Sequence, residues 1–192
     1  SQKILNSNQF VLPKPVLSFF LMFTIFIFCH GHLNGDEPQD VLRFHFVDVG
    51  YGGAIFIEFP DSSNMLIDAG EKLSAPQLTG YLSFLGVPAI DAAVITHPHK
   101  NHFEGYFHVL ENFPVQRLYM NGDRNSEEGY EELLDLFRQK SVLISHLKRG
   151  DRIGNLPGLV EMAVLHTAQL SGNANDNSMV LWLKHKAVSF LF

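Results

Sequence analysis

The chain has 192 residues, of which 46% are hydrophobic and 18% are charged, and its formal net charge is −6. This composition excludes an intrinsically disordered chain, and the length is sufficient for one domain with a sizeable core. A negatively charged protein without a block of Lys and Arg does not attract phosphate backbones at long range, so a broad nucleic-acid-binding surface is excluded. A single phosphodiester at a metal ion stays compatible with this charge, because the ion supplies positive charge locally.

The amino-terminal segment, residues 1–31, has the pattern of a targeting signal. Two lysines precede residues 16–28, which carry no charged side chain. This apolar run is short for a membrane span of roughly 20 residues but matches a signal-peptide core of about 7–15 residues. We expect either a signal peptide cleaved after Gly31 or an uncleaved membrane anchor, and a polar linker over residues 32–40. Both alternatives predict a secreted or extracytoplasmic protein that contacts the membrane only through this segment.

The first part of the following domain predicts β-hairpins. Apolar and polar residues alternate over 41–47, and two more apolar runs follow at 54–59 and 65–67. A glycine-rich turn, Gly50 to Gly53, and a Pro-Asp-Ser-Ser-Asn turn separate the three runs. Closely spaced strands joined by such turns are typical of antiparallel hairpins.

The remainder alternates helical and strand patterns. Apolar residues three or four apart predict a helix that ends before Gly86, with Ser74 as its N-cap. The same spacing predicts two further helices, and short apolar runs predict six further strands. The predicted helices are 106–110 and 126–140, and the predicted strands are 92–96, 115–120, 142–147, 159–165, 179–183 and 187–192. This order predicts one domain over residues 41–192, of mixed α/β (α+β) class, with helices covering a sheet.

Three histidines lie within six positions directly after the strand predicted at 92–96. They are His97, His99 and His102. Neutral imidazole is the commonest side-chain ligand for zinc, and a turn that leaves a strand holds its backbone rigidly enough for the rings to converge. The sequence therefore predicts a metal site here, with a histidine-rich surface loop as the alternative.

Other polar residues at strand ends allow two interpretations each. Asp68 ends the third strand and is either a site carboxylate or a turn residue that accepts backbone hydrogen bonds. His166 ends a later strand and is either a further metal ligand or a half-buried histidine satisfied by the backbone. No GxSxG motif is present, so a serine nucleophile of that type is not expected.

Four motifs resemble those of one known family, the metallo-β-lactamase superfamily. They are DVGYGGA at 48–54, LIDAG at 66–70, THPHKNH at 96–102 and NDNS at 175–178. The first and last motifs are similar to the extracytoplasmic hydrolase domain of the competence protein ComEC and its free-standing relatives. The resemblance implies an αββα sandwich that binds one or two ions of Zn²⁺ or Mn²⁺.

The resemblance also implies roles for individual residues. His97 and His99 would bind the first metal with His166 as third ligand, and His102 would belong to the second metal. Asp68 would order the metal-binding loop, and Asn101 stands at the position of a catalytic Asp. The implied function is metal-dependent hydrolysis, in which a metal-activated hydroxide attacks a phosphodiester or a related ester or amide bond. The substrate would be a small molecule or a nucleic-acid phosphodiester.

Several departures from the family pattern support a rival interpretation. Asn101 and Lys100 replace an Asp and a small residue, and a neutral amide binds a divalent cation weakly. Gly53 and Tyr51 stand where the turn usually has Asp and Gln. The family's later Gly-Asp and histidine-bearing loop do not occur before Phe192, which predicts an incomplete domain. The alternative function is therefore a degenerate, non-catalytic relative that acts as a binding or structural module.

Overall fold

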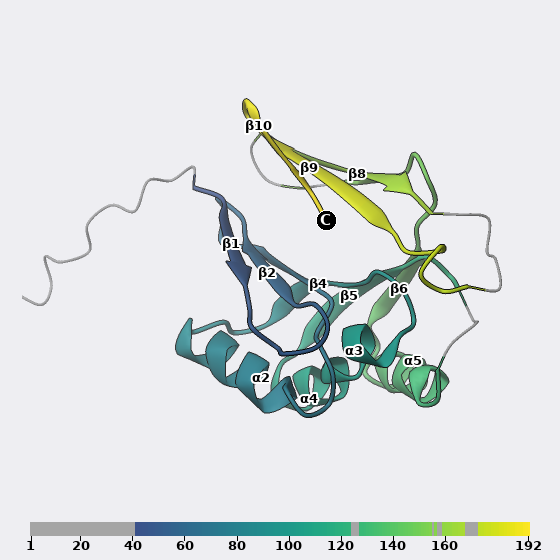
Figure 1. Ribbon diagram of the computed structural model, residues 1–192. Coiled ribbons are helices and arrows are strands. Elements are labelled where there is room, and N and C mark those ends of the chain that lie inside the picture. Colours follow the sequence, from purple (N-terminus) through teal and green to yellow (C-terminus); the bar gives the residue numbers. More distant parts are fainter. Residues whose placement is uncertain (1–40, 124–126, 155, 157–158, 168–172) are drawn as a thin grey trace, which may run out of the picture. The chain divides into compact units, whose positions relative to one another are not determined.

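Two β-sheets face each other, and helices cover the outer face of one of them (Figure 1). The computed structural model describes residues 41–123, 127–154, 156, 159–167 and 173–192. The predicted signal or anchor and the predicted linker therefore lie outside the described residues. Within the described part of the chain, no helix is both long and apolar enough to cross a membrane.

The larger sheet has six strands in the order of the chain. The first three strands form antiparallel hairpins, as predicted, and β3 to β6 run parallel. The strands are β1 (Arg43–Phe46), β2 (Ile55–Glu58), β3 (Asn64–Ile67), β4 (Ile90–Ile95), β5 (Val115–Met120) and β6 (Leu143–His146). Because β3 and β4 are parallel neighbours, the loops after both strands emerge at the same edge of the sheet.

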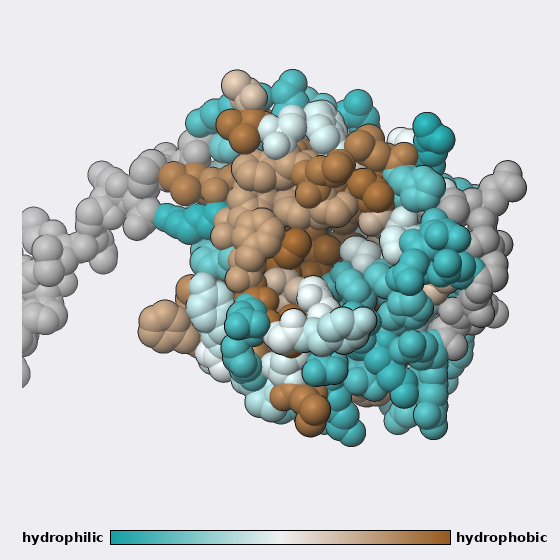
Figure 2. Space-filling view, in the orientation of Figure 1, coloured by the Kyte–Doolittle hydropathy of each residue, from teal (hydrophilic) through white to brown (hydrophobic). Residues whose placement is uncertain are grey.

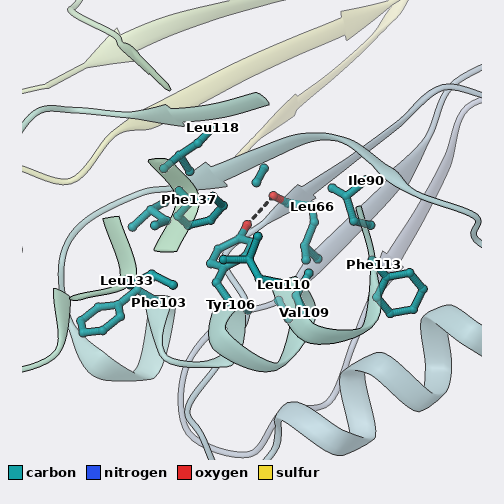
Figure 3. Packing of buried hydrophobic residues seen from close by; sticks show 14 of the residues in the cluster. Leu66, Ile90, Phe103, Tyr106, Val109, Leu110, Phe113, Leu118, Leu133 and Phe137 are labelled. Carbon is teal, nitrogen blue, oxygen red and sulfur yellow. Dashed lines mark hydrogen bonds between the residues drawn. The ribbon is translucent and has the colours of Figure 1, made fainter. Parts of the chain in front are cut away.

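Four helices pack on one face of this sheet through their apolar sides. They are α2 (Ala75–Phe84), α3 (Lys100–Phe103), α4 (Gly105–Asn112) and α5 (Tyr130–Gln139). Figure 3 shows the buried cluster that α4 and α5 form with the sheet. The fully buried Tyr106 of α4 donates a hydrogen bond to the carbonyl oxygen of Leu66 (2.7 Å) and accepts one from the N–H of Val94 (3.3 Å). This phenol therefore joins α4 to two adjacent strands.

The smaller sheet is antiparallel, in the order β10-β9-β8-β7. Its strands are β7 (Arg152–Ile153), β8 (Val160–His166), β9 (Val180–His185) and β10 (Val188–Leu191). Its inward side chains, such as Met162 and Leu181, form a second core with residues of the larger sheet. Phe44 of β1 contacts Phe190 and Phe192 at ring-centroid distances of 4.2 and 5.7 Å. Figure 2 shows hydrophobic residues gathered where β9 and β10 approach β1.

Most predicted elements are confirmed, with three differences. The helix predicted from residue 126 begins at Tyr130, because its N-cap Gly129 has a φ of +93° that does not extend a right-handed helix. Helix α3 and strand β7 were not predicted, since each is too short to show a periodic pattern. The mixed α/β class and the facing sheets agree with the predicted sandwich. Among the described helices, all pack on the six-stranded sheet, so the outer helical layer of the smaller sheet is not part of the described chain.

Candidate functional site

Most of the predicted site residues, but not His166, lie at the edge where β3 and β4 end. Three loops meet there: the glycine turn 50–53, the loop 68–70 and the segment 96–102. Their backbones are hydrogen-bonded to each other, from Ala69 N–H to the His102 carbonyl (2.8 Å) and from Gly70 N–H to the Gly53 carbonyl (2.9 Å). The parallel pairing of β3 and β4 thus brings motifs far apart in the sequence into one place.

Asp68 is the polar centre of this arrangement. It is only 5% exposed and has a φ of +56°, a left-handed conformation that Asp tolerates better than most residues. Its carboxylate accepts hydrogen bonds from Thr96 N–H (2.8 Å), Thr96 Oγ1 (2.7 Å) and His102 Nδ1 (2.7 Å). Asp68 therefore joins the end of β3 to two points of the histidine segment.

These hydrogen bonds determine the tautomers of two histidines. The Asp68 carboxylate only accepts, so His102 Nδ1 must carry the proton. The Thr96 hydroxyl donates its proton to Asp68, so in its contact with His97 Nδ1 (3.1 Å) it must accept. Both imidazoles consequently have Nε2 as the nitrogen with a free lone pair when neutral. This is the arrangement that second-shell partners impose on metal-binding histidines.

The His97 ring contacts the rings of the other two histidines of the segment. The His97 ring centroid lies 4.1 Å from that of His102 and 4.7 Å from that of His99. Burial is the main cause that lowers the pKa of His97 to about 4, followed by the neighbouring His102, while Asp68 acts in the opposite direction. His97 is 6% exposed and hence neutral at physiological pH. A neutral imidazole is the form that a metal ion binds.

Asn101 contributes through its backbone. Its carbonyl oxygen accepts a hydrogen bond from Gly53 N–H (3.4 Å), and a Cβ on Gly52 would lie 1.9 Å from the same oxygen. Gly52 must therefore be glycine for the turn to pack against α3. Within the described residues, the Asn101 side-chain amide makes no hydrogen bond. Its assignment as a catalytic residue stays a prediction.

His166 lies at the end of β8 and is exposed. Its Nε2 is 3.2 Å from the carbonyl oxygen of Asp176, and no ring contact joins it to the three clustered histidines in the described part of the chain. Among the described residues, no three His, Cys, Asp or Glu side chains are arranged to hold one metal ion. The predicted ligand set of His97, His99, His102 and His166 therefore stays a prediction.

Two features of the site were missed from the sequence. Glu127 accepts a hydrogen bond from Lys100 N–H (2.7 Å) at the start of α3, and its charge acts on the pKa of His97. Asn177 of the NDNS motif is fully buried and donates to Asp123 Oδ2 (2.6 Å), while its carbonyl accepts from Asn121 Nδ2 (2.7 Å). The density of polar residues at 173–177 was a signal for Asn177, but nothing in the sequence pattern indicated Glu127.

Comparison with known proteins gives solved structures with a similar fold. No family model matches the chain. In structure, the chain is similar to CmlA, a diiron β-hydroxylase from Streptomyces venezuelae, with a TM-score of 0.52 and 16% identity over 81% of this chain and 29% of CmlA. It is similar to MEM-A1, a subclass B3 metallo-β-lactamase from a soil metagenome library, with a TM-score of 0.51 and 16% identity over 79% of this chain and 58% of MEM-A1. The fold of this chain is therefore similar to that of solved metallo-β-lactamases.

One curated relative fits the resemblance to ComEC that the motifs indicate. ComE operon protein 3 of Bacillus subtilis (strain 168) is 26% identical over 189 residues, which cover 89% of this chain. The chain spans 23% of that protein's length. The similarity to a ComEC-like protein inferred from DVGYGGA and NDNS is thus found by whole-sequence comparison as well.

Proposed function

We propose that this chain is a metal-dependent hydrolase of the metallo-β-lactamase fold, ComEC-like, that cleaves a phosphodiester or a related ester or amide bond. The observation that carries the proposal is the hydrogen-bonded chain from Asp68 through Thr96 to His97 and from Asp68 to His102. It orients two touching imidazoles so that the Nε2 lone pair of each is free. The solved structures with this fold include a diiron enzyme and a metallo-β-lactamase, which supports a metal-dependent activity.

The residues present fit a divalent ion in their chemistry. His97, His99 and His102 would hold it, since their rings are in contact and two of them have a fixed tautomer. Among the described side chains no set of three is preformed for an ion, so binding would require these rings or further ligands to move into position. When bound, Zn²⁺ or Mn²⁺ supplies Lewis acidity and lowers the pKa of a coordinated water.

The chain's own residues have supporting roles in this proposal. Asp68 orients His102 and, through Thr96, His97, and its burial keeps water from competing for these bonds. Glu127 stabilises the start of α3, which carries Asn101 and His102. Burial keeps His97 neutral, so that at pH 7 no proton has to leave this ring before an ion binds.

A second function is a non-catalytic relative that keeps the fold as a binding or structural module. The neutral side chain of Asn101, at the position where the family carries Asp, favours this alternative. A single weakly held ion, or none, would then suffice.

We also propose that the domain lies outside the cytoplasm, secreted or anchored, on the basis of the uncharged segment 16–28.

Metal content and hydrolysis distinguish these proposals. We expect the full chain, loaded with Zn²⁺ or Mn²⁺ and dialysed, to retain about one ion and to hydrolyse bis(p-nitrophenyl) phosphate. His97→Ala should lose both properties, whereas His108→Ala, which alters an exposed histidine on α4, should keep them. Retained metal without hydrolysis of any phosphodiester, ester or amide probe supports the non-catalytic relative. Absence of metal from the folded wild-type chain contradicts the hydrolase proposal and leaves the non-catalytic relative.

Asn101→Asp sharpens the test of the second metal. If the amide has weakened a second ion site, the carboxylate should raise the metal content above that of the wild type. An unchanged metal content would count against a lost ligand at this position. Asn101→Gln serves as the control, because it changes the side chain without adding charge.

A further inference from the structure

A pocket lies at the opposite edge of the six-stranded sheet from the histidines. Its volume is about 350 Å³, within the lower range for small-molecule sites. It opens where β3 and β4 begin, between the two facing sheets. The lining residues are Phe59, Ser63, Asn64, Met65, Asp91, Ala92, Arg117, Tyr119, Ile153, Gly154 and Leu156.

The polar groups at one side of this pocket are satisfied by each other. Asp91 Oδ2 accepts a hydrogen bond from Asn64 N–H (2.9 Å), and Asp91 Oδ1 accepts one from Gln116 Nε2 (2.7 Å). The Asn64 side chain in turn donates to the Ala89 carbonyl (2.9 Å) and accepts from Asp91 N–H (3.2 Å). The one carboxylate lining the pocket is therefore already engaged on both oxygens.

Arg117 has no such partner. Its guanidinium lies 5.8 Å from the centroid of the Tyr119 ring, and within the described residues no carboxylate pairs with it. Residues 155, 157 and 158, which adjoin the pocket lining in sequence, are Asn, Pro and Gly and carry no acidic group. A guanidinium stays charged at all physiological pH values, and a half-buried cation without a counterion is unfavourable. Its flat fork of donors matches a carboxylate in two parallel hydrogen bonds.

We propose that this pocket binds a small organic carboxylate with a compact apolar body. The carboxylate pairs with Arg117, which makes a cation–π contact with Tyr119. The apolar body packs on the hydrophobic walls that both sheets supply, formed by Phe59, Met65, Ile153 and Leu156. This site is separate from the histidine edge and does not depend on the proposed hydrolysis.

The test titrates phenylacetate into the full chain in the presence of a chelator, followed by ¹⁵N-resolved NMR. We expect saturable shifts of backbone amides at Met65, Tyr119 and Ile153, and binding at least about tenfold weaker for the neutral analogue phenylacetamide, because the charge-assisted hydrogen bonds are lost. Arg117→Gln should weaken phenylacetate binding by a similar factor. Arg152→Gln is the matched control, since Arg152 is exposed and paired with Glu161 (3.0 Å), and it should leave the affinity unchanged.

Several results would overturn the proposal. One is the absence of saturable shifts with phenylacetate on the folded wild-type chain. Others are equal affinity for phenylacetate and phenylacetamide, or shifts confined to residues 96–102. If Arg117→Gln does not fold, Arg117→Lys keeps the charge and should retain partial binding, and the comparison of the two wild-type titrations still decides the outcome. The chelator excludes metal from the histidine edge, so this result is independent of the metal measurements.

Discussion

The two edges of the six-stranded sheet carry opposite chemistry. At the edge where β3 and β4 end, Asp68 gathers hydrogen bonds from Thr96 and His102 and leaves imidazole lone pairs free. At the edge where these strands begin, both Asp91 carboxylate oxygens accept hydrogen bonds from neighbouring residues, and among the described residues no carboxylate pairs with the Arg117 guanidinium. One edge thus presents electron pairs that suit a cation, and the other presents a cation that suits an anion. The chemistry of each edge therefore depends on which donors its carboxylate accepts hydrogen bonds from and which polar groups it leaves unpaired.

The largest difference between the edges should appear when each carboxylate is removed. Asp68→Ala leaves three donors unpaired in a buried place, and we expect a loss of about 3–5 kcal/mol in the free energy of unfolding. Asp91→Ala, at a partly exposed position, should cost only about 1–2 kcal/mol. Denaturant unfolding followed by circular dichroism, with a chelator present, measures both. Equal losses in the free energy of unfolding would show that the two carboxylates contribute equally to the fold, which contradicts the expected difference between the two edges.

The second expected effect is a pH dependence that belongs to the histidine edge. His97 has a pKa of about 4 in the folded chain, against 6.5 as the ordinary value. Between these values the unfolded chain binds the proton and the folded chain does not, so stability falls as the pH is lowered from 6.5 to 4. The total loss is about 3 kcal/mol, and none is expected from this group above pH 6.5.

Unfolding of the metal-free chain between pH 7 and pH 4 measures this loss. His97→Asn should flatten the slope over that range. A slope that is the same in His97→Asn and in the wild type would mean that other groups cause the acid sensitivity.

The smallest of the three effects concerns the glycine turn that covers α3. Gly52→Ala places a Cβ against the Asn101 carbonyl and requires a φ of +121°, so we expect a cost of about 2 kcal/mol and a lower metal affinity. At Gly53 the nearest atoms to a Cβ belong to His102, at 3.7 Å, which is an ordinary contact. Gly53→Ala should therefore change stability by less than about 0.5 kcal/mol. Thermal unfolding of the two variants side by side decides whether the turn is held by this close approach.

Much of the fold was predictable because short-range sequence patterns, such as alternating apolar residues and turn residues, determine its strands and helices. The hairpins follow from alternating residues separated by turn residues, and the start of α2 follows from Ser74 and the proline after it. The extra length predicted for α5 shows the limit of this reasoning. A positive φ at Gly129 ends the helix on its amino-terminal side, and periodicity alone does not reveal it.

The candidate site was also predictable only in part from the sequence. The spacing of His97, His99 and His102 within one segment was visible in the sequence, and the structure brings their rings into contact. The THPHKNH motif includes Thr96, but its hydrogen bond to Asp68 joins segments distant in the chain, and no motif marked Glu127. Where His166 lies relative to the three rings depends on how the smaller sheet packs, which residue spacing does not determine.

The sequence by itself determined which side chains this protein has available and on which strand ends they lie, because alternation, helical spacing and turn residues act over a few positions. The tertiary structure decided which nitrogen of each histidine is free and which charge lacks a partner. Both depend on hydrogen bonds between residues 27 or 28 positions apart, such as Asp91 with Asn64 and Asp68 with Thr96. Such bonds form only after parallel strands align their ends and the two sheets exclude water from the space between them.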